Sequence, residues 1–144
     1  YNNYWVLIFS YPENSHTEDY RQEVLDLVNA QRAKYGLTAL EMGDDNLTAA
    51  AQTRAEEIAV VNSHTRPDGS KCFTVLKDYG VTDTPTGENA AWGSVSPEEV
   101  VNAWMNSEGH RANILNPEAR KMSVGYYYNS NSTWGHQWIQ IFTK

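Results

Sequence analysis

Helix-type and strand-type patterns occupy different parts of this chain, and their order limits the folds that it can adopt. Apolar residues recur at helical spacing over residues 17–36 and again over residues 46–61. Alternation over 122–128, a polar turn over 129–132 and a second strand pattern over 134–142 predict a β-hairpin. Because helices come first and few βαβ units are indicated, we expect an α+β fold in which helices pack on an antiparallel sheet.

The N-terminal segment, residues 1–9, also has a strand-type composition and ends before a proline at position 12. Within it, residues 5–9 resemble residues 138–142 in residue type. Two interpretations stay open: two strands drawn from the same few residue types, or an N-terminal copy that adds an edge strand or pairs with a neighbouring molecule. We therefore divide the chain into an N-terminal extension, residues 1–16, and a domain, residues 17–144.

The chain is acidic, with 18 acidic residues against 11 basic ones and a formal net charge of −7. Lysine and arginine form no cluster that could follow a phosphate backbone, so we expect no nucleic-acid partner. The same charge balance disfavours binding to an anionic membrane surface.

The longest apolar run, residues 5–9, is too short to span a bilayer, so we expect no transmembrane segment in this chain. The chain begins at Tyr1 without an initiator methionine or a signal segment, and we expect any export signal or anchor to lie upstream of Tyr1. The single cysteine, Cys72, excludes an internal disulfide. We interpret it as a small core residue rather than a reactive thiol.

The segment 104–117 places a titratable side chain, His110, between two anchored pieces of chain. Before it, Ser96-Pro97-Glu98-Glu99 has the signature of a helix start with a capping box. Gly109 then suits a chain reversal that breaks the helix. Apolar residues on both sides of the break would hold His110 on a rigid frame, where a site could be built.

His64 and Glu88 lie in two other segments of unusual composition. His64 falls in the turn-rich loop 63–69, which follows the second predicted helix. Residues 81–86 are predicted to form a loop, and Glu88 comes next as a lone acid in a segment of small residues, 87–93, that glycines bound. A carboxylate in such surroundings needs a partner.

Three kinds of site are compatible with His64, Glu88 and His110. Imidazole nitrogen and carboxylate oxygen are both ligands for a divalent metal such as zinc. The same groups could form a general acid–base pair, or a buried hydrogen-bond pair that only ties loops together. Their spacing matches no local metal motif, so the residues alone leave all three alternatives open. Ser107 lies close before His110, but without an oxyanion signature it gives poor support for a catalytic nucleophile.

Six segments, taken in order, resemble the superfamily of cysteine-rich secretory, antigen-five and pathogenesis-related proteins, whose shared unit is called the CAP or SCP-like domain. The matching segments are 28–32, 63–69, 87–89, 104–117, 124–126 and 138–142. The match extends from Glu18 to Lys144 and is most similar to the bacterial branch. The resemblance implies a three-layer α-β-α sandwich with a central antiparallel sheet, in a secreted or cell-surface protein.

The resemblance also implies a large cleft centred on two histidines and two acids. By motif, His64, His110 and Glu88 occupy three of these positions. In the animal and plant pattern a second glutamate stands at the place of Ser107, and the adjacent Glu108 would point about 100° further round a helix. The fourth position is therefore left unassigned. As neighbours of the cleft we take Asn89, Ser107, Glu108 and Arg111.

The first functional hypothesis is a secreted binding module whose cleft, formed by His64, Glu88 and His110, holds a small ligand or a divalent metal such as zinc, with His64 and His110 as the possible metal ligands. The family has been associated with divalent metals and, in some eukaryotic members, with sterols or other lipids. The partner would be a small molecule, a lipid or an extracellular protein. The alternative is a hydrolase, for example a peptidase, that uses a metal-bound water or an acid–base pair drawn from the same three candidate catalytic residues. A third hypothesis is an interaction domain whose polar cluster only holds loops in place.

Overall fold

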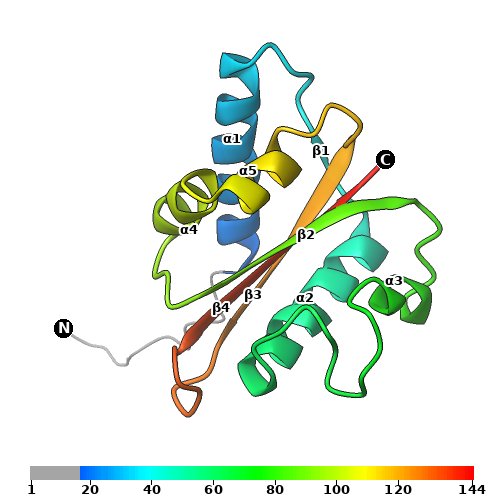
Figure 1. The fold of residues 1–144 in the computed structure, drawn as a ribbon, viewed down its shortest axis with the longest axis vertical. Coiled ribbons are helices and arrows are strands. Elements are labelled where there is room, and N and C mark those ends of the chain that lie inside the picture. Colours follow the sequence, from blue (N-terminus) through cyan, green and yellow to red (C-terminus); the bar gives the residue numbers. More distant parts are fainter. Residues whose placement is uncertain (1–16) are drawn as a thin grey trace, which may run out of the picture.

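Nine helices and strands follow one another over residues 17–144, the part of the chain that the computed structural model describes (Figure 1). Their bounds are α1 Thr17–Lys34, β1 Glu41–Met42, α2 Asp45–Val60, α3 Thr74–Asp78, β2 Pro85–Trp92, α4 Pro97–Met105, α5 Glu108–Ile114, β3 Lys121–Tyr128 and β4 His136–Thr143. None of these helices has a stretch long and apolar enough to cross a membrane. Residues 1–16 lie outside the described part, so the predicted N-terminal extension and its edge strand stay predictions.

The four strands form one sheet in the order β1-β3-β4-β2. Strands β3 and β4 form the predicted hairpin, in which Tyr126 lies opposite Trp138, and β2 pairs antiparallel with β4. Only the two-residue strand β1 departs from this pattern, because it pairs parallel with the start of β3. The central sheet is therefore antiparallel except at one short edge.

Helices cover both faces of the sheet, with α1, α4 and α5 on one face and α2 and α3 on the other (Figure 1). Alternation along β4 supplies both cores. Trp138 and Phe142 pack in the core under α1 and α4, whereas Ile139 and Ile141 pack in the core under α2 and α3. The predicted three-layer α-β-α sandwich is thus confirmed.

Strand β2 was not predicted from the sequence, because its small residues lack the β-branched and aromatic composition of strands. It lies at the edge of the sheet beside β4. Side chains from the helical layer formed by α4 and α5 donate hydrogen bonds to backbone carbonyl oxygens along this edge. Trp104 Nε1 donates to the backbone carbonyl oxygen of Ala90 at 3.1 Å, and Asn113 Nδ2 donates to the backbone carbonyl oxygen of Glu88 at 3.4 Å. These contacts protect the edge from pairing with another chain.

The start of α4 agrees with the sequence, but the predicted break at Gly109 is wrong. Ser96 caps α4 by accepting a hydrogen bond from the Glu99 backbone N–H at 3.1 Å. The Glu99 side chain accepts from Val95 rather than from Ser96, one position before the cap. The chain turns at Asn106 and Ser107, and Gly109 lies inside α5 without a positive φ. Glycine was therefore not needed for the reversal, because Asn106 and Ser107 provide it.

The fully buried Arg32 fixes α5 against the end of α1. Its Nη1 donates to the carbonyl oxygens of Ile114 and Asn116 at 2.8 and 2.9 Å, and its Nε donates to that of Thr38 at 2.8 Å. A cation at the last carbonyls of α5 satisfies groups that the helix leaves without a partner. The helix that carries His110 is therefore fixed at its C-terminal end.

The close packing of α2 on β3 gives a direct test of the fold. A Cβ atom at Gly125 would overlap the backbone carbonyl oxygen of Ala51, which cannot move without shifting α2. We expect Gly125→Ala to lower the free energy of unfolding by about 3 kcal/mol. At the helical Gly109 no heavy atom lies within 4 Å of the added Cβ. Gly109→Ala should raise the free energy of unfolding by about 0.5 kcal/mol. Urea unfolding of both variants measures these changes, and equal effects would contradict the packing.

Candidate functional site

A buried ion pair between α2 and β2 forms the base of the candidate site. Arg54 on α2 is fully buried, and the side chain of Glu88 on β2 is 2% exposed. Arg54 Nε donates to Glu88 Oε2 at 2.8 Å, and Arg54 Nη2 donates to Glu88 Oε1 at 3.1 Å. This two-point contact holds both carboxylate oxygens in fixed positions.

Arg54 fits beneath the sheet because α2 presents small residues on its buried face. These buried neighbours on the helix are Ala50, Ala51 and Ala55. Their short side chains leave room for a guanidinium at helical spacing between them. Burial acts to lower the pKa of Arg54, but hydrogen bonds and charges from Glu88 and Glu57 outweigh it and raise this pKa above its ordinary value. Arg54 is therefore a permanent cation within the site.

His64 lies on the solvent side of the same carboxylate. Its Nδ1 is 2.7 Å from Glu88 Oε1, and its side chain is 57% exposed. Because the pKa of Glu88 is lowered and the carboxylate is ionised, it can only accept, so Nδ1 carries the proton of this hydrogen bond. In the neutral imidazole the lone pair is then on Nε2. The pair fixes both the ring and its tautomer.

Two arginines hold the loop that carries His64. Arg54 Nη2 donates to the carbonyl oxygen of Ser63 at 3.0 Å. On the other side, Arg66 Nη2 donates to Glu57 Oε2 at 2.7 Å, and Glu57 Oε1 also accepts from Arg54 at 2.9 Å. Glu57 thus joins both arginines, and the loop is fixed on each side of His64.

His110 lies on α5, in the opposite helical layer. Asn89 Nδ2 donates to the His110 carbonyl oxygen at 3.1 Å and to Gln140 Oε1 at 3.1 Å, and Asn113 Nδ2 donates to Asn89 Oδ1 at 2.9 Å. A Cβ at Gly87 would overlap the Asn113 amide, so this close approach needs glycine. The buried amides tie α5 to β2 and β4 and hold the backbone of His110.

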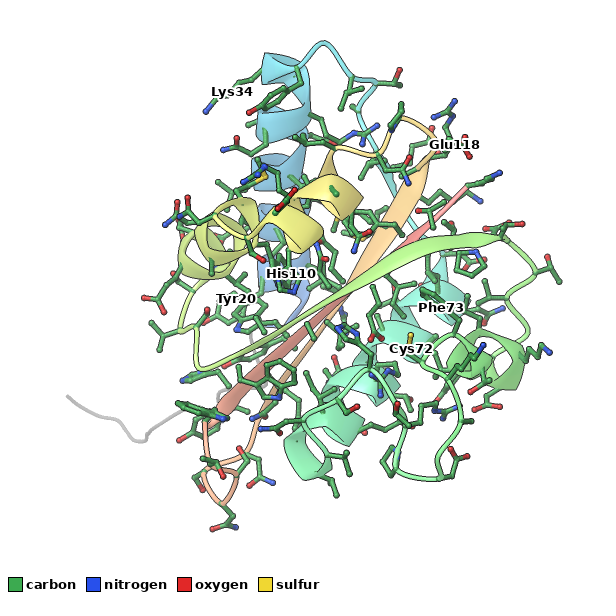
Figure 2. All side chains as sticks on the ribbon, viewed as in Figure 1. Tyr20, Lys34, Cys72, Phe73, His110 and Glu118 are labelled. Atoms are coloured by element: carbon green, nitrogen blue, oxygen red, sulfur yellow. The ribbon has the colours of Figure 1, made fainter. Side chains whose placement is uncertain are left out.

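The alternation of β2 directs two neighbouring residues toward opposite helical layers. Glu88 points toward α2 and the next residue, Asn89, points toward α5, because consecutive side chains of a strand face opposite sides of the sheet. Figure 2 shows His110 on the α5 side of β2 and Cys72 on the α2 side. Since β2 is an edge strand, groups from both layers can approach each other around it.

The pKa values of the two histidines are displaced in opposite directions. The hydrogen bond with Glu88 raises the pKa of His64, although burial and the charge of Arg54 oppose this. Burial and the charge of His64 lower the pKa of His110. Burial acts to raise the pKa of Glu88, but its hydrogen bonds with His64 and Arg54 bring this pKa below the ordinary value. The ionised Glu88 thus favours a proton on His64, whereas His110 favours the neutral form.

Cys72 lies beside this cluster and is buried. Burial, followed by the charge of Glu88, raises the pKa of Cys72 to about 11. A thiol with such a pKa forms little nucleophilic thiolate near neutral pH. The burial agrees with the expectation of a small core residue.

The other sequence-predicted neighbours make no hydrogen bond to the Glu88 carboxylate within the described residues. Ser107 is half-buried at the N-terminal cap of α5, and Glu108 in the next position is exposed. Arg111 Nη1 donates back to the Met105 carbonyl oxygen at 2.9 Å and so supports the turn between α4 and α5. Of the four neighbours, only Asn89 makes a hydrogen bond to one of the three central residues.

Sequence reasoning missed Arg54, the residue that contacts Glu88 most extensively. The signal was present, because Arg54 falls within the apolar stripe that Leu47, Ala51 and Ile58 define on α2. An arginine on the buried face of a helix requires a buried acid as partner. Glu88, recognised as an acid in need of a partner, is that residue.

The large cleft implied by the family resemblance stays a prediction. Hollows of about 550 and 530 Å³ occur in the part of the chain that the structure describes. The first lies between α1 and α4, beside Leu27 and Asn102, and the second lies along α3, beside Phe73 and Val81. Neither is lined by a residue of the candidate site.

The donor set limits how a metal ion could be held. Within residues 17–144 no group of three or more His, Cys, Asp or Glu side chains is arranged to hold one. Both oxygens of Glu88 already accept hydrogen bonds from Arg54, and one of them also faces His64. The imidazoles of His64 and His110 are therefore the groups available to a cation. The predicted zinc site, with His64 and His110 as its possible ligands, stays a prediction.

Comparisons with known proteins find one family whose members are similar to most of this chain. The sequence pattern of the cysteine-rich secretory protein family, CAP, matches residues 25–142. The uncharacterized protein YkwD of Bacillus subtilis is 42% identical over 122 residues, which cover 83% of this chain and 47% of that protein. This chain thus spans less than half the length of that relative.

Two solved structures share the fold. An extracellular protein containing an SCP domain, from Bacillus anthracis, has a TM-score of 0.80 at 25% identity, over 94% of this chain and 45% of that one. An outer surface protein of Borrelia burgdorferi has a TM-score of 0.73 at 26% identity, over 90% of this chain and 95% of that one. The arrangement of helices and strands is therefore shared with extracellular and surface proteins.

The raised pKa of His64 predicts a pH-dependent contribution to stability. A folded-state pKa above the unfolded value of about 6.5 stabilises the fold fully at pH below that value, and this contribution is lost as the pH rises through the folded-state pKa. The lowered pKa of Glu88 keeps its charge throughout this range. We expect His64→Gln to reduce the free energy of unfolding more at about pH 5.5 than at about pH 8. Urea unfolding at both values measures it, and a larger loss at the higher pH would contradict the pairing.

Proposed function

This chain belongs to the cysteine-rich secretory protein family, and we propose that it is a binding module whose ligand is held between the imidazoles of His64 and His110. One observation carries the proposal. A 2.7 Å hydrogen bond fixes an imidazole that is 57% exposed on a carboxylate side chain that is 2% exposed. A buried ion pair that served only the fold would not need an exposed, oriented histidine as its third member.

The cluster presents a defined set of polar groups to a ligand. His64 offers Nε2, as a lone pair in the neutral ring or as an N–H donor in the protonated ring. His110, whose pKa is lowered, offers a neutral imidazole. A divalent cation would be held by these two rings, with Glu88 orienting His64, and when bound it would supply Lewis-acid chemistry. A small molecule with an oxygen acceptor would instead be bound by their N–H groups.

The setting of the proposed module is outside the cell or at its surface. The two structural relatives are described as an extracellular protein and an outer surface protein. The net charge of −7 suits a solvent-exposed domain without a nucleic-acid partner. We propose that a small molecule, a lipid or an extracellular protein is the partner there.

A second function, acid–base hydrolysis, is favoured by the opposite displacements of the two histidine pKa values. Paired groups whose environments separate their pKa values can divide the roles of acid and base. Protonated His64 would donate to a leaving group, and neutral His110 would accept a proton from water. Glu88 would stabilise the proton on His64. A peptide or ester bond is the substrate class that such a pair would cleave.

Zinc tests the binding module, because zinc takes neutral imidazole nitrogen as a ligand. We expect calorimetric titration of the metal-stripped protein at about pH 7.5 to give one zinc ion per chain. Binding should fade at about pH 5.5, because protonated histidine cannot ligate. His64→Gln and His110→Gln should each weaken binding by about tenfold or more.

His136→Gln is the matched control for the zinc titration. His136 bonds to the Tyr126 hydroxyl through Nδ1 at 2.7 Å and lies on β4, away from Glu88. Its replacement should leave zinc affinity unchanged. Absence of zinc binding to the unmodified protein, or an equal loss in all three variants, would contradict a cation site at His64 and His110.

Hydrolysis has its own signature in the dependence of rate on pH. The base His110 must be neutral and the acid His64 protonated, so activity should be highest between the lowered pKa of His110 and the raised pKa of His64. An assay with a chromogenic ester and a fluorogenic peptide mixture measures this profile. A bell-shaped profile that His64→Gln and His110→Gln each abolish would support the second function. A rate equal to that of the double variant at every pH would exclude it for these substrates.

A further inference from the structure

We infer that Arg54 reserves Glu88 for His64, so that Glu88 orients the imidazole and is not itself a ligand of whatever the site binds. Arg54 is then a positioning residue that limits a bound cation to the two imidazoles. The inference rests on the proposed function in placing the ligand at His64 and His110, and it adds which residues exclude a third protein ligand.

The hydrogen bonds of the Glu88 carboxylate are the first observation behind this inference. Arg54 Nε faces Oε2 at 2.8 Å, whereas Oε1 receives both Arg54 Nη2 at 3.1 Å and His64 Nδ1 at 2.7 Å. Each oxygen is therefore directed at a donor from the protein. With a side chain that is 2% exposed, Glu88 has little surface left for another partner.

Electrostatics carries the second step. A metal ion bound to a Glu88 oxygen would lie beside the guanidinium that contacts the same carboxylate. Two cations at that distance repel each other strongly in a buried site, where water screens poorly. Arg54 cannot relieve the repulsion by losing its proton, because a guanidinium stays protonated in proteins and the pKa of Arg54 is raised further by its acidic partners. The guanidinium thus occupies the place that a metal ion at Glu88 would need.

The surroundings of Arg54 carry the third step, because they prevent it from swinging away. It is fully buried, and it also donates to Glu57 Oε1 at 2.9 Å and to the Ser63 carbonyl oxygen at 3.0 Å. Glu57 is in turn held by Arg66. Moving Arg54 would leave the buried Glu88 carboxylate with His64 as its remaining donor and would remove a donor from Glu57 and from the Ser63 carbonyl, which is costly.

The consequence is a defined ligand class. A cation held by two imidazoles keeps open coordination positions, which water or an oxygen group of a second molecule would fill. The carboxylate–histidine pair would act as in other metal proteins, where a carboxylate on the far ring nitrogen fixes the ligating one. The site would therefore bind a metal together with an oxygen-bearing molecule rather than enclose a metal alone.

The first experiment measures the zinc affinity of Arg54→Met by calorimetry. Removing the guanidinium frees Glu88 as a third ligand, so we expect binding at least about tenfold tighter than in the unmodified protein. A residue that served only the fold would weaken binding when lost, so a gain distinguishes the two roles. Arg54→Lys retains the cation and should not show the gain. If the Met variant is folded by circular dichroism and binds zinc no more tightly, the inference is overturned.

Arg66→Met is the matched control for this experiment. Arg66 contacts Glu57 as Arg54 does, and its other hydrogen bonds go to Thr74 and Asp78 rather than to Glu88. Its loss removes a partner of Glu57 and one support of the His64 loop without freeing Glu88, so we expect zinc affinity to stay the same or fall, and not to rise. A tenfold gain in this variant would show that loosening the arginine cluster, and not freeing Glu88, increases affinity, and would overturn the inference.

The second experiment uses the unmodified protein and decides the inference even where Arg54→Met does not fold. Nitrogen-correlated NMR of the imidazoles should find neutral His64 with its proton on Nδ1, the position that faces Glu88. This proton should persist when zinc is added, because zinc would take Nε2. A proton on Nε2 in the free protein, or loss of the Nδ1 proton on zinc binding, would overturn the inference.

The two proposals fail in different ways. If the unmodified protein binds no zinc, the proposed cation site fails, whereas the His64 tautomer in the free protein still reports whether Glu88 is reserved for it. If zinc binds and the Nδ1 proton disappears, the binding module stands and the role assigned to Arg54 fails.

Discussion

The ion pair between Arg54 and Glu88 is the interaction on which the candidate site depends. Burying two charges costs more than a single contact returns, so each member needs further partners. Arg54 finds them in Glu57 and Ser63, and Glu88 finds one in His64. The satisfied cluster connects helix α2, the loop after it and the edge strand β2. Such a pair contributes more to the uniqueness of the arrangement than to overall stability, which is what a functional site requires.

The position of β2 at the edge of the sheet brings two helical layers to one place. Successive residues of this strand serve opposite layers, since Glu88 holds the histidine from the α2 side and Asn89 holds the backbone of the histidine from the α5 side. Neither layer could form the site alone. The close approach of α5 to the strand depends on Gly87, and its other end is fixed by Arg32. The whole sandwich therefore sets the relation between the two imidazoles.

Local patterns in the sequence were sufficient for much of the fold and pointed to His64 and Glu88, which are paired in the structure. Helices α1 and α2, the capped start of α4 and the terminal hairpin all follow from periodicity and turn composition. Strand β2 does not, because its small residues become a strand only by pairing with β4 at the far end of the chain. The predicted break at Gly109 was wrong because Asn106 and Ser107, which precede it, provide the turn. Arg54 was missed because its meaning depends on a carboxylate distant in sequence.

The central claim is that Arg54 and Glu88 act as one unit, and a double-mutant cycle tests it most directly. The free energy of unfolding would be measured for Arg54→Met, Glu88→Gln and the double variant. Each single change leaves a buried group without its partner and should cost about 3 kcal/mol. The double variant should then be more stable than the sum of the single effects predicts, by about 2 kcal/mol. Additive losses would show that the two side chains are independent and would contradict the account.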